Sequence, residues 1–320
     1  MTTLTIESES RQTVDAQVNR TADGVTYEIV GPLGAPVVAV LGGISATRHV
    51  TTTALDGRPG WWEEIVGPGR AIDTNRFLVI GIDYQSSFRG SSTVTTNEQA
   101  DALASALDHA RIRTLHAIVG ASYGGMVALA FGAGHSVRCK KLIVISAAHE
   151  SDPLATALRH LQRRVVELGS NLGRERDALT IARGIAMTSY LTPHYFKERF
   201  IDSESADSSA IENRIGSYLK TKGEDFADRW TSEKYTALSL SLDLHRVRPE
   251  DITVPTTVIA VSGDRLVPIE QSRQLVNRLA GSAQLIEIDS AFGHDAFLGD
   301  ARRIAPFIEE LLNVDRRVAV

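Results

Sequence analysis

The sequence predicts an α/β protein with a mostly parallel central sheet and an inserted helical segment. Short apolar runs alternate with longer amphipathic stretches, which is typical of repeated βαβ units. Several runs are nearly continuous Val, Ile and Leu, as expected for parallel strands that are covered on both faces. From about Asp152 to His245 the alternation is interrupted, because that stretch shows helical patterns alone.

The predicted sheet has an antiparallel edge over residues 13–30, followed by six apolar strands. The six strands are Val37–Leu41, Phe77–Ile82, Leu115–Val119, Lys141–Ile145, Thr256–Val261 and Gln284–Ile288. Amphipathic stretches between them predict the helices Asn97–Ala110, Tyr123–Gly134, Ile269–Leu279 and Ala301–Leu312.

The interrupting helical stretch lies between a strand that ends at Ile145 and one that begins at Thr256. We therefore expect it to form a cap over the carboxyl edge of the sheet. Within it, the polar run Asp202–Ser209 is expected to be a loop. The expected domains are a core of residues 1–150 and 250–320 and a helical cap or lid of residues 151–249.

The composition is that of an ordinary globular protein. Hydrophobic residues make up 43% of the 320 residues and charged residues 23%, which is enough apolar material for a large core. A net charge of −5, spread along the chain, argues against a nucleic-acid or anionic-membrane partner. The single cysteine, Cys139, allows no internal disulfide. With neither a signal peptide nor an apolar run of membrane-spanning length, a cytoplasmic protein is expected.

The strongest local motif is Gly120-Ala121-Ser122-Tyr123-Gly124, between a predicted strand and a predicted helix. A serine in this context sits on a sharp turn that exposes its hydroxyl above the sheet. The start of the helix adds positive potential beside a developing oxyanion. The alternative is a turn that uses Gly and Ser for loop reasons alone. The flanking strand and helix favour Ser122 as a nucleophile.

Two further residues supply the base and the acid that a serine nucleophile needs. Asp264 ends a predicted strand in the phrase SGDRLVP, and His294 follows the next strand in FGHDAF. Each alone could be a solvated loop residue. Together they follow Ser122 in the order Ser, Asp, His, at strand ends where catalytic groups gather. The arrangement predicts the α/β-hydrolase fold with Ser122, Asp264 and His294 as a catalytic triad.

Two backbone amides are expected to form the oxyanion hole. One is that of Tyr123, directly after the nucleophile, and the other is that of Ile44 in the glycine-rich loop GGISATRH. No metal site is expected, because the nine histidines lack HxxxH or HxH spacing and no cysteine cluster exists.

Several longer phrases of the chain, between about Ala35 and Leu298, resemble one family. They are similar to the homoserine O-acyltransferases (MetX type) of the α/β-hydrolase superfamily. The phrases are PGWWEEIVGPGRAIDTNRFLVIGID, GASYGGMVAL, ARGIAMTSYL, SYLKTKGEDFADRW, SGDRLVP and GHDAFL. The GWWE…GPG…IDT phrase and the two cap phrases are much more specific to the family than the serine motif.

The resemblance implies an acyltransferase in methionine or cysteine biosynthesis. An acyl-CoA co-substrate would acylate Ser122, and the hydroxyl of homoserine, or of serine, would then take the acyl group. No bound cofactor is implied. Arg183 is expected to grip the carboxylate of the amino acid, Tyr190 to add a hydroxyl contact and Asp295 to hold its ammonium group. Partners are therefore small molecules, and the family's habit of pairing through the cap suggests a homodimer.

The sequence departs from the family pattern at several positions. Tyr123 stands where Met is usual, Asp83–Ser86 (DYQS) replaces an Asn-x-x-Gly phrase, and Arg89–Asn97 is a short connection. These changes are expected near the acyl pocket. A succinyl donor, unlike an acetyl donor, would require a cation there, for which the candidates are Arg48, Arg89 and Arg159.

Two alternatives to the transferase remain open from the sequence. One is a serine esterase or thioesterase that uses the same triad. The other is a non-catalytic binding protein on this fold, which would be expected to have a damaged triad.

Overall fold

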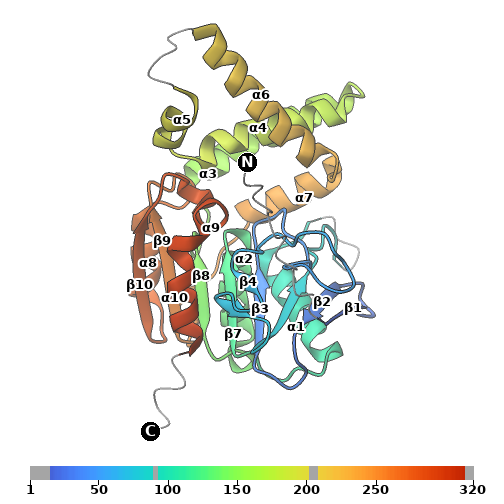
Figure 1. The fold of residues 1–320 in the computed structure, drawn as a ribbon, viewed down its shortest axis with the longest axis vertical. Helices are drawn as coiled ribbons and strands as arrows, with labels where there is room; N and C mark the ends of the chain where they lie inside the picture. The colour runs from blue at the N-terminus through green and yellow to red at the C-terminus, as the bar shows by residue number, and fades with distance from the viewer. Residues whose placement is uncertain (1–14, 89–92, 202–207, 314–320) are drawn as a thin grey trace, which may run out of the picture.

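The computed structural model describes residues 15–88, 93–201 and 208–313, without the side chains of 208–210. Its centre is an eight-stranded sheet with the strand order β1-β2-β6-β3-β7-β8-β9-β10 (Figure 1). The strands are β1 (Ala16–Arg20), β2 (Thr26–Val30), β3 (Val37–Leu41), β6 (Leu78–Ile82), β7 (Ala117–Ala121), β8 (Leu142–Ile145), β9 (Thr256–Ser262) and β10 (Ala283–Asp289). The short strands β4 (Val66–Gly67) and β5 (Ile72–Asp73) pair separately.

The sheet is parallel from β6 to β10 and antiparallel at one edge, where β2 pairs with both β1 and β6. This confirms the predicted α/β-hydrolase fold and its antiparallel edge. In the register, Ala121 of β7 pairs with Ile145 of β8, and Ile145 pairs with Ile259 of β9. The carboxyl ends of these central strands therefore meet at one edge of the sheet, where the candidate site lies.

Helices cover both faces of the sheet. One face carries α1 (Thr96–His109), α2 (Tyr123–Gly134) and α8 (Ile269–Arg278), whose buried side chains share one hydrophobic cluster with the strands. The other face carries α10 (Ala301–Asn313) and the long segment after β3, which form a second cluster around Trp62 and Ile304. Since both faces are covered, β6, β7 and β8 are apolar and buried throughout.

Most predicted elements match within two residues, with one informative shift. The third strand was expected at Leu115–Val119, but β7 spans Ala117–Ala121. It pairs with β3 and β8 up to the residue before Ser122, whereas Leu115 makes only an isolated bridge with Cys139. Pairing on both sides thus outweighs the local apolar pattern and carries the strand into the serine turn.

Five helices lie between β8 and β9. They are α3 (Pro153–Asn171), α4 (Glu175–Tyr190), α5 (Pro193–Phe200), α6 (Ser208–Ala227) and α7 (Ser232–Asp243). Asp152 caps the start of α3 by accepting the amides of Leu154 and Ala155. The helices α3 to α6 lie beyond the carboxyl edge of the sheet (Figure 1), and α4 packs against both α3 and α6. The division into a core and a cap of residues 151–249 stays a prediction.

The expected loop Asp202–Ser209 falls partly outside the described residues, which omit 202–207. Ser208 and Ser209 belong instead to the start of α6, so the loop prediction is wrong for these two residues.

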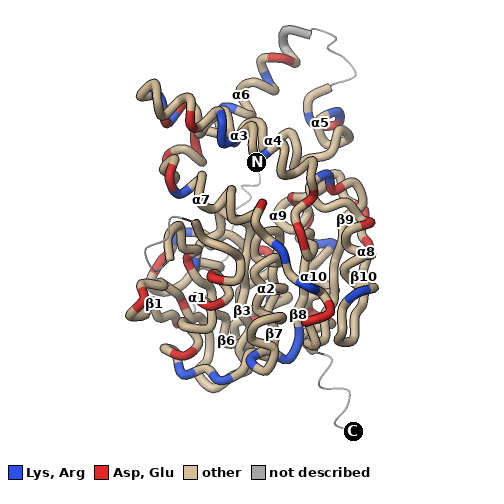
Figure 2. Tube along the Cα trace, turned by 180° about the vertical axis from the view of Figure 1, so that it is seen from behind, with Lys and Arg blue, Asp and Glu red and all other residues tan. Residues whose placement is uncertain are grey.

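Charged residues of both signs are interspersed along the chain (Figure 2), in keeping with the modest net charge. Over the ranges that the structure describes, none of the helices has the length and apolarity needed to span a bilayer.

The serine turn depends on two glycines. Ser122 has φ 52° and ψ −119°, a strained conformation for a residue with a side chain. A Cβ on Gly124 would lie 2.2 Å from the carbonyl oxygen of Leu41, and a Cβ on Gly120 would lie 2.3 Å from that of Gly124. Helix α2 therefore approaches strand β3 closely because Gly124 lacks a side chain, and strand β7 because Gly120 lacks one.

We expect Gly124→Ala to lower the free energy of unfolding by about 2 kcal/mol or more, because the added methyl group must displace backbone. Urea unfolding of the purified protein measures this. Gly134→Ala is the matched control, since Gly134 ends the same helix and a Cβ there meets no atom within 4 Å. The control should be neutral or slightly stabilising. Equal losses in both variants would contradict the steric account.

Candidate active site

The side chains of Ser122, His294 and Asp264 form a continuous hydrogen-bonded chain. The Oγ of Ser122 lies 2.8 Å from Nε2 of His294, and Nδ1 of His294 lies 2.8 Å from Oδ2 of Asp264. Since a carboxylate only accepts, His294 donates through Nδ1 and its Nε2 is left to accept from the serine hydroxyl. This is the arrangement in which an imidazole can take a proton from a serine.

Each member of this chain comes from the end of a different strand. Ser122 lies between β7 and α2, Asp264 follows β9, and His294 lies in the short helix η3 (Gly293–Asp295) after β10. The other carboxylate oxygen of Asp264 accepts the amides of Leu266 and Val267 at 2.8 and 3.0 Å. These bonds fix the carboxylate, which in turn fixes the orientation of the imidazole.

Burial and charge act in opposite directions on His294. Removal from water alone would lower the pKa of this imidazole, but the charge and hydrogen bond of Asp264 outweigh that effect. The pKa of His294 therefore lies above its ordinary value of 6.5. A raised pKa makes the imidazole a stronger base toward the serine hydroxyl.

The residues expected to form the oxyanion hole lie beside one cavity, which Ser122 and His294 also line. Ile44 and Ser122 both line the cavity, and Tyr123 directly follows Ser122 at the start of α2. Within the described part of the chain, neither the Ile44 nor the Tyr123 amide donates to another protein group. Both N–H groups are therefore free to bind an oxygen of a substrate.

The three residues expected to bind the amino acid line the same cavity. The guanidinium carbon of Arg183 lies 5.2 Å from the ring centre of Tyr190 and 5.4 Å from that of Phe226. The Tyr190 ring lies 5.7 Å from the imidazole of His294. Burial raises the pKa of Asp295, although the charge of Arg183 opposes this rise. The structure thus brings a cation, a phenol and a carboxyl group beside Ser122 and His294.

The three candidate cations for an acyl pocket occupy different places. Arg48 does not line the cavity and forms an ion pair with Asp83 at 2.6 Å. Arg89 lies outside the described residues. Arg159, on α3, lines the cavity, donates through Nε to Asp243 at 2.6 Å and also bonds Ser151.

The charge around Arg159 is not balanced by its one carboxylate. Asp243 also forms an ion pair with Arg163 at 2.6 Å, so two guanidinium groups share one negative charge. Among the described residues the Nη1 group of Arg159 has no hydrogen-bond partner. The Nη1 group can therefore donate to a negatively charged group of a substrate, in a cavity that Glu150 and Asp152 also line.

The residues of the GWWE phrase form part of the cavity lining and hold the segment after β3 in place. Trp61 lines the cavity, whereas Trp62 is fully buried and donates its indole N–H to the carbonyl of Phe297 at 2.7 Å. Glu63 accepts the amide of Gly60 at 2.8 Å and the hydroxyl of Thr52 at 2.6 Å. The segment after β3 is thereby tied to the segment that carries His294.

Sequence reasoning missed Ser146, which lines the cavity directly after β8. Its backbone has φ 49°, its side chain is buried, and its hydroxyl has no partner among the residues described. Its place directly after an apolar strand, like that of Asp264 after β9, is the signal that could have found it.

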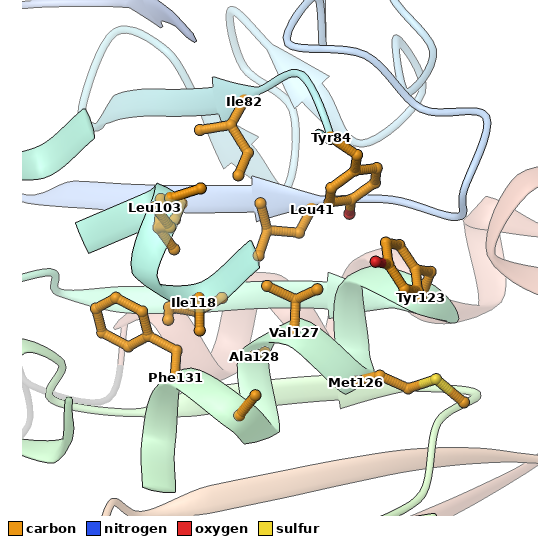
Figure 3. Packing of buried hydrophobic residues seen from close by; sticks show 14 of the residues in the cluster. Leu41, Ile82, Tyr84, Leu103, Ile118, Tyr123, Met126, Val127, Ala128 and Phe131 are labelled. Carbon is orange, nitrogen blue, oxygen red and sulfur yellow. The ribbon is translucent and has the colours of Figure 1, made fainter. Parts of the chain in front are cut away.

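The expectation that the departures from the family pattern lie near the acyl pocket stays a prediction, but two of these side chains face away from the cavity. The side chains of Tyr84 and Tyr123 do not line the cavity. Both are buried and pack edge to face against each other, with ring centres 4.8 Å apart (Figure 3). A large aromatic ring after a strand is as well suited to the core as to a pocket.

For the residues that the structure describes, no group of His, Cys, Asp or Glu is arranged to hold a metal ion.

Comparison with known proteins places this geometry in a family. Residues 36–301 match the model of the α/β-hydrolase fold family. The homoserine O-succinyltransferase of Xanthomonas campestris pv. campestris is 41% identical over 295 residues, covering 92% of this chain and 80% of the relative. The homoserine O-acetyltransferase of Thermus thermophilus is 31% identical, covering 80% of this chain and 73% of the relative.

A solved structure supports the fold. The homoserine O-acetyltransferase from Bacillus anthracis superposes with a TM-score of 0.81 at 19% identity, covering 94% of this chain and 98% of that one. The resemblance expected from the sequence is thus confirmed. The chain belongs to the homoserine O-acyltransferase family of the α/β-hydrolase superfamily.

Proposed function

We propose that this protein transfers a succinyl group from succinyl-CoA to the hydroxyl of homoserine through an acyl-Ser122 intermediate. One observation carries the proposal. A single cavity holds the Ser122–His294 pair together with the side chains of three arginines, Arg159, Arg183 and Arg229. Arg159 and Arg183 are the two that we assign to substrate carboxylates. The product of this reaction has two carboxylates, one from the succinyl group and one from the amino acid. The names of the relatives support acyl transfer over the esterase alternative.

The first half-reaction acylates the serine. Nε2 of His294 takes the proton of Ser122 as Oγ attacks the thioester carbonyl carbon, while Asp264 stabilises the imidazolium. The amides of Ile44 and Tyr123 bind the resulting oxyanion. The carbon–sulfur bond then breaks, and the leaving sulfur takes the proton from His294. Free CoA thiol and a succinyl ester on Ser122 result.

The second half-reaction uses the same groups in reverse. His294 takes the proton of the homoserine hydroxyl as that oxygen attacks the ester carbonyl on Ser122. The ester bond to Ser122 breaks, His294 returns the proton to Oγ, and O-succinylhomoserine leaves. Arg183 holds the carboxylate of the amino acid, Asp295 its ammonium group, and Tyr190 adds a hydroxyl contact. This positioning allows the hydroxyl to compete with water.

The choice of succinyl over acetyl rests on Arg159. It is the candidate cation that lines the cavity, and its Nη1 can donate to the distal carboxylate of the succinyl group. An acetyl group has no carboxylate to accept a hydrogen bond from Nη1. A pocket distinguishes homoserine from serine only modestly, because they differ by one methylene. We therefore choose homoserine on the name of the 41% identical relative.

Product analysis tests the reaction. With succinyl-CoA and homoserine, the wild type should release CoA thiol and form O-succinylhomoserine. Without the amino acid, thiol release should stop after about one equivalent per active site. Ser122→Ala should show neither the burst nor the product. Thiol release that continues at the same rate without homoserine, and yields no O-acyl product, would instead identify a thioesterase.

Arg159→Met should weaken the preference for succinyl-CoA over acetyl-CoA. Loss of a charge-assisted hydrogen bond of about 1.5–3 kcal/mol predicts a fall of about 10- to 100-fold in kcat/KM for succinyl-CoA. The value for acetyl-CoA should change little. Arg163→Gln is the matched control, because Arg163 shares Asp243 but does not line the cavity. Equal falls for both donors in the Arg159 variant would exclude it as the acyl determinant.

The pH dependence should follow His294, which acts as a base only when it is neutral. Because its pKa is raised, kcat/KM for succinyl-CoA should fall as the pH drops through a midpoint above 6.5. In Asp264→Asn the rate should be orders of magnitude lower. Its midpoint should also move to lower pH, since burial then acts on the imidazole without the charge of Asp264 to oppose it. An unmoved midpoint in that variant would assign the titration to another group.

A further inference from the structure

The carbonyl oxygen of Gly42 accepts two hydrogen bonds at the edge of the active site. The hydroxyl of Tyr84 donates to it at 2.8 Å, and so does the amide of Gly124 at 2.8 Å. Gly42 directly follows β3 and begins the loop that carries Ile44. The two bonds therefore hold the start of this loop against the sheet and against helix α2.

Because position 42 must be glycine, the conformation of the loop has to be fixed by contacts with neighbouring groups. A Cβ at this position would lie 2.6 Å from the side chain of Ala46 and 2.7 Å from that of Trp61, so no larger residue fits. Two consecutive glycines, Gly42 and Gly43, are intrinsically flexible. Bonds from neighbouring groups must fix the peptide planes that lead to the Ile44 amide.

Tyr84 is well placed to be that anchor. It follows β6, its side chain is buried, and it does not line the cavity. Burial raises the pKa of its hydroxyl well above the ordinary value of 10.0, so the hydroxyl remains a neutral donor. The Tyr84 hydroxyl thus bonds the start of the loop from within the core, whereas Gly43 and Ile44 of the same loop line the cavity.

Tyr123, the other residue expected to supply an oxyanion amide, packs directly on Tyr84. The ring of Tyr123 packs edge to face on the ring of Tyr84, at an interplanar angle of 79° (Figure 3). The hydroxyl of Tyr123 lies 2.7 Å from Oγ of Ser241 on helix α7. Tyr84 therefore holds the loop that supplies the Ile44 amide, and the side chain of Tyr123 holds the residue that supplies the other amide. The two tyrosine rings are in contact with each other.

We infer that Tyr84 is a positioning residue, whose hydroxyl fixes the Ile44 amide relative to the Tyr123 amide through the carbonyl of Gly42. It touches no substrate atom and acts only through the loop. The inference rests on the proposed acyl-serine chemistry, in which both amides bind the oxyanion. A donor displaced by a few tenths of an ångström stabilises the tetrahedral state less while substrate binding is unchanged.

Tyr84→Phe removes the hydroxyl and keeps the ring. Because Gly42 keeps its bond from Gly124, the variant should fold, which urea unfolding checks. Removal of a whole oxyanion donor costs about 10²–10³-fold, so loss of its anchor should lower the rate of Ser122 acylation by about 10-fold. KM for succinyl-CoA should remain within about twofold. The control is Tyr27→Phe, which removes a buried hydroxyl bonded to His109 at 2.8 Å and should retain wild-type rates.

A transition-state analogue separates positioning from packing. A trifluoromethyl ketone that forms a tetrahedral oxyanion on Ser122 should bind Tyr84→Phe more weakly, in proportion to the loss of rate. An unchanged analogue affinity, or a wild-type acylation rate in this variant, would overturn the inference.

The same measurements keep this inference distinct from the proposed function. Acylation by a p-nitrophenyl ester reports on the oxyanion hole whatever the natural acyl donor is. If the wild type reacts with the ester but not with succinyl-CoA, the proposed donor fails, and the comparison of Tyr84→Phe with wild type still tests the anchor.

Discussion

The close approach of helix α2 to strand β3 is the constraint on which the active site depends. It requires Gly124 to lack a side chain, and Gly120 must lack one for α2 to lie as closely against β7. Between these glycines, Ser122 has a conformation that a residue with a side chain rarely adopts. The approach also brings the Gly124 amide to the Gly42 carbonyl, which links the serine turn to the loop that carries Ile44. One backbone contact thereby aligns the nucleophile and both expected oxyanion donors, and it places the positive end of α2 beside them.

The charged groups of the cavity are held in place by hydrogen bonds and by helix packing. A buried carboxylate such as Asp264 is costly unless it is hydrogen bonded, and here two amides and the imidazole of His294 satisfy it. Arg159 and Arg183 line the same cavity from different helices, α3 and α4. Helices that pack against each other can hold two cations apart, because the packing fixes their positions against mutual repulsion. The cavity thus offers separate cations for the two carboxylates of a substrate pair, beside the acidic side chains of Glu150, Asp152 and Asp295.

The sequence was sufficient for the features that local chemistry controls. Alternating apolar runs predicted the parallel sheet, and the G-x-S-x-G turn with Asp264 and His294 in order predicted side chains that the structure joins by hydrogen bonds. The glycine-rich loop indicated Ile44, and the ARGIAMTSYL phrase pointed to Arg183 and Tyr190 through resemblance. These signals are readable because strand ends, turn residues and residue types are properties of short segments.

Long-range contacts decided the rest. The sequence left Arg48, Arg89 and Arg159 equivalent, whereas the folded chain pairs Arg48 with Asp83 and brings Arg159 into the cavity. It suggested that Tyr123 lies near the acyl pocket, and only the structure shows that its ring turns into the core against Tyr84. Which way a side chain points depends on neighbours that are distant in the chain. By itself the sequence determined the kinds of groups present and their order, and only the tertiary structure decided which of them face the substrate.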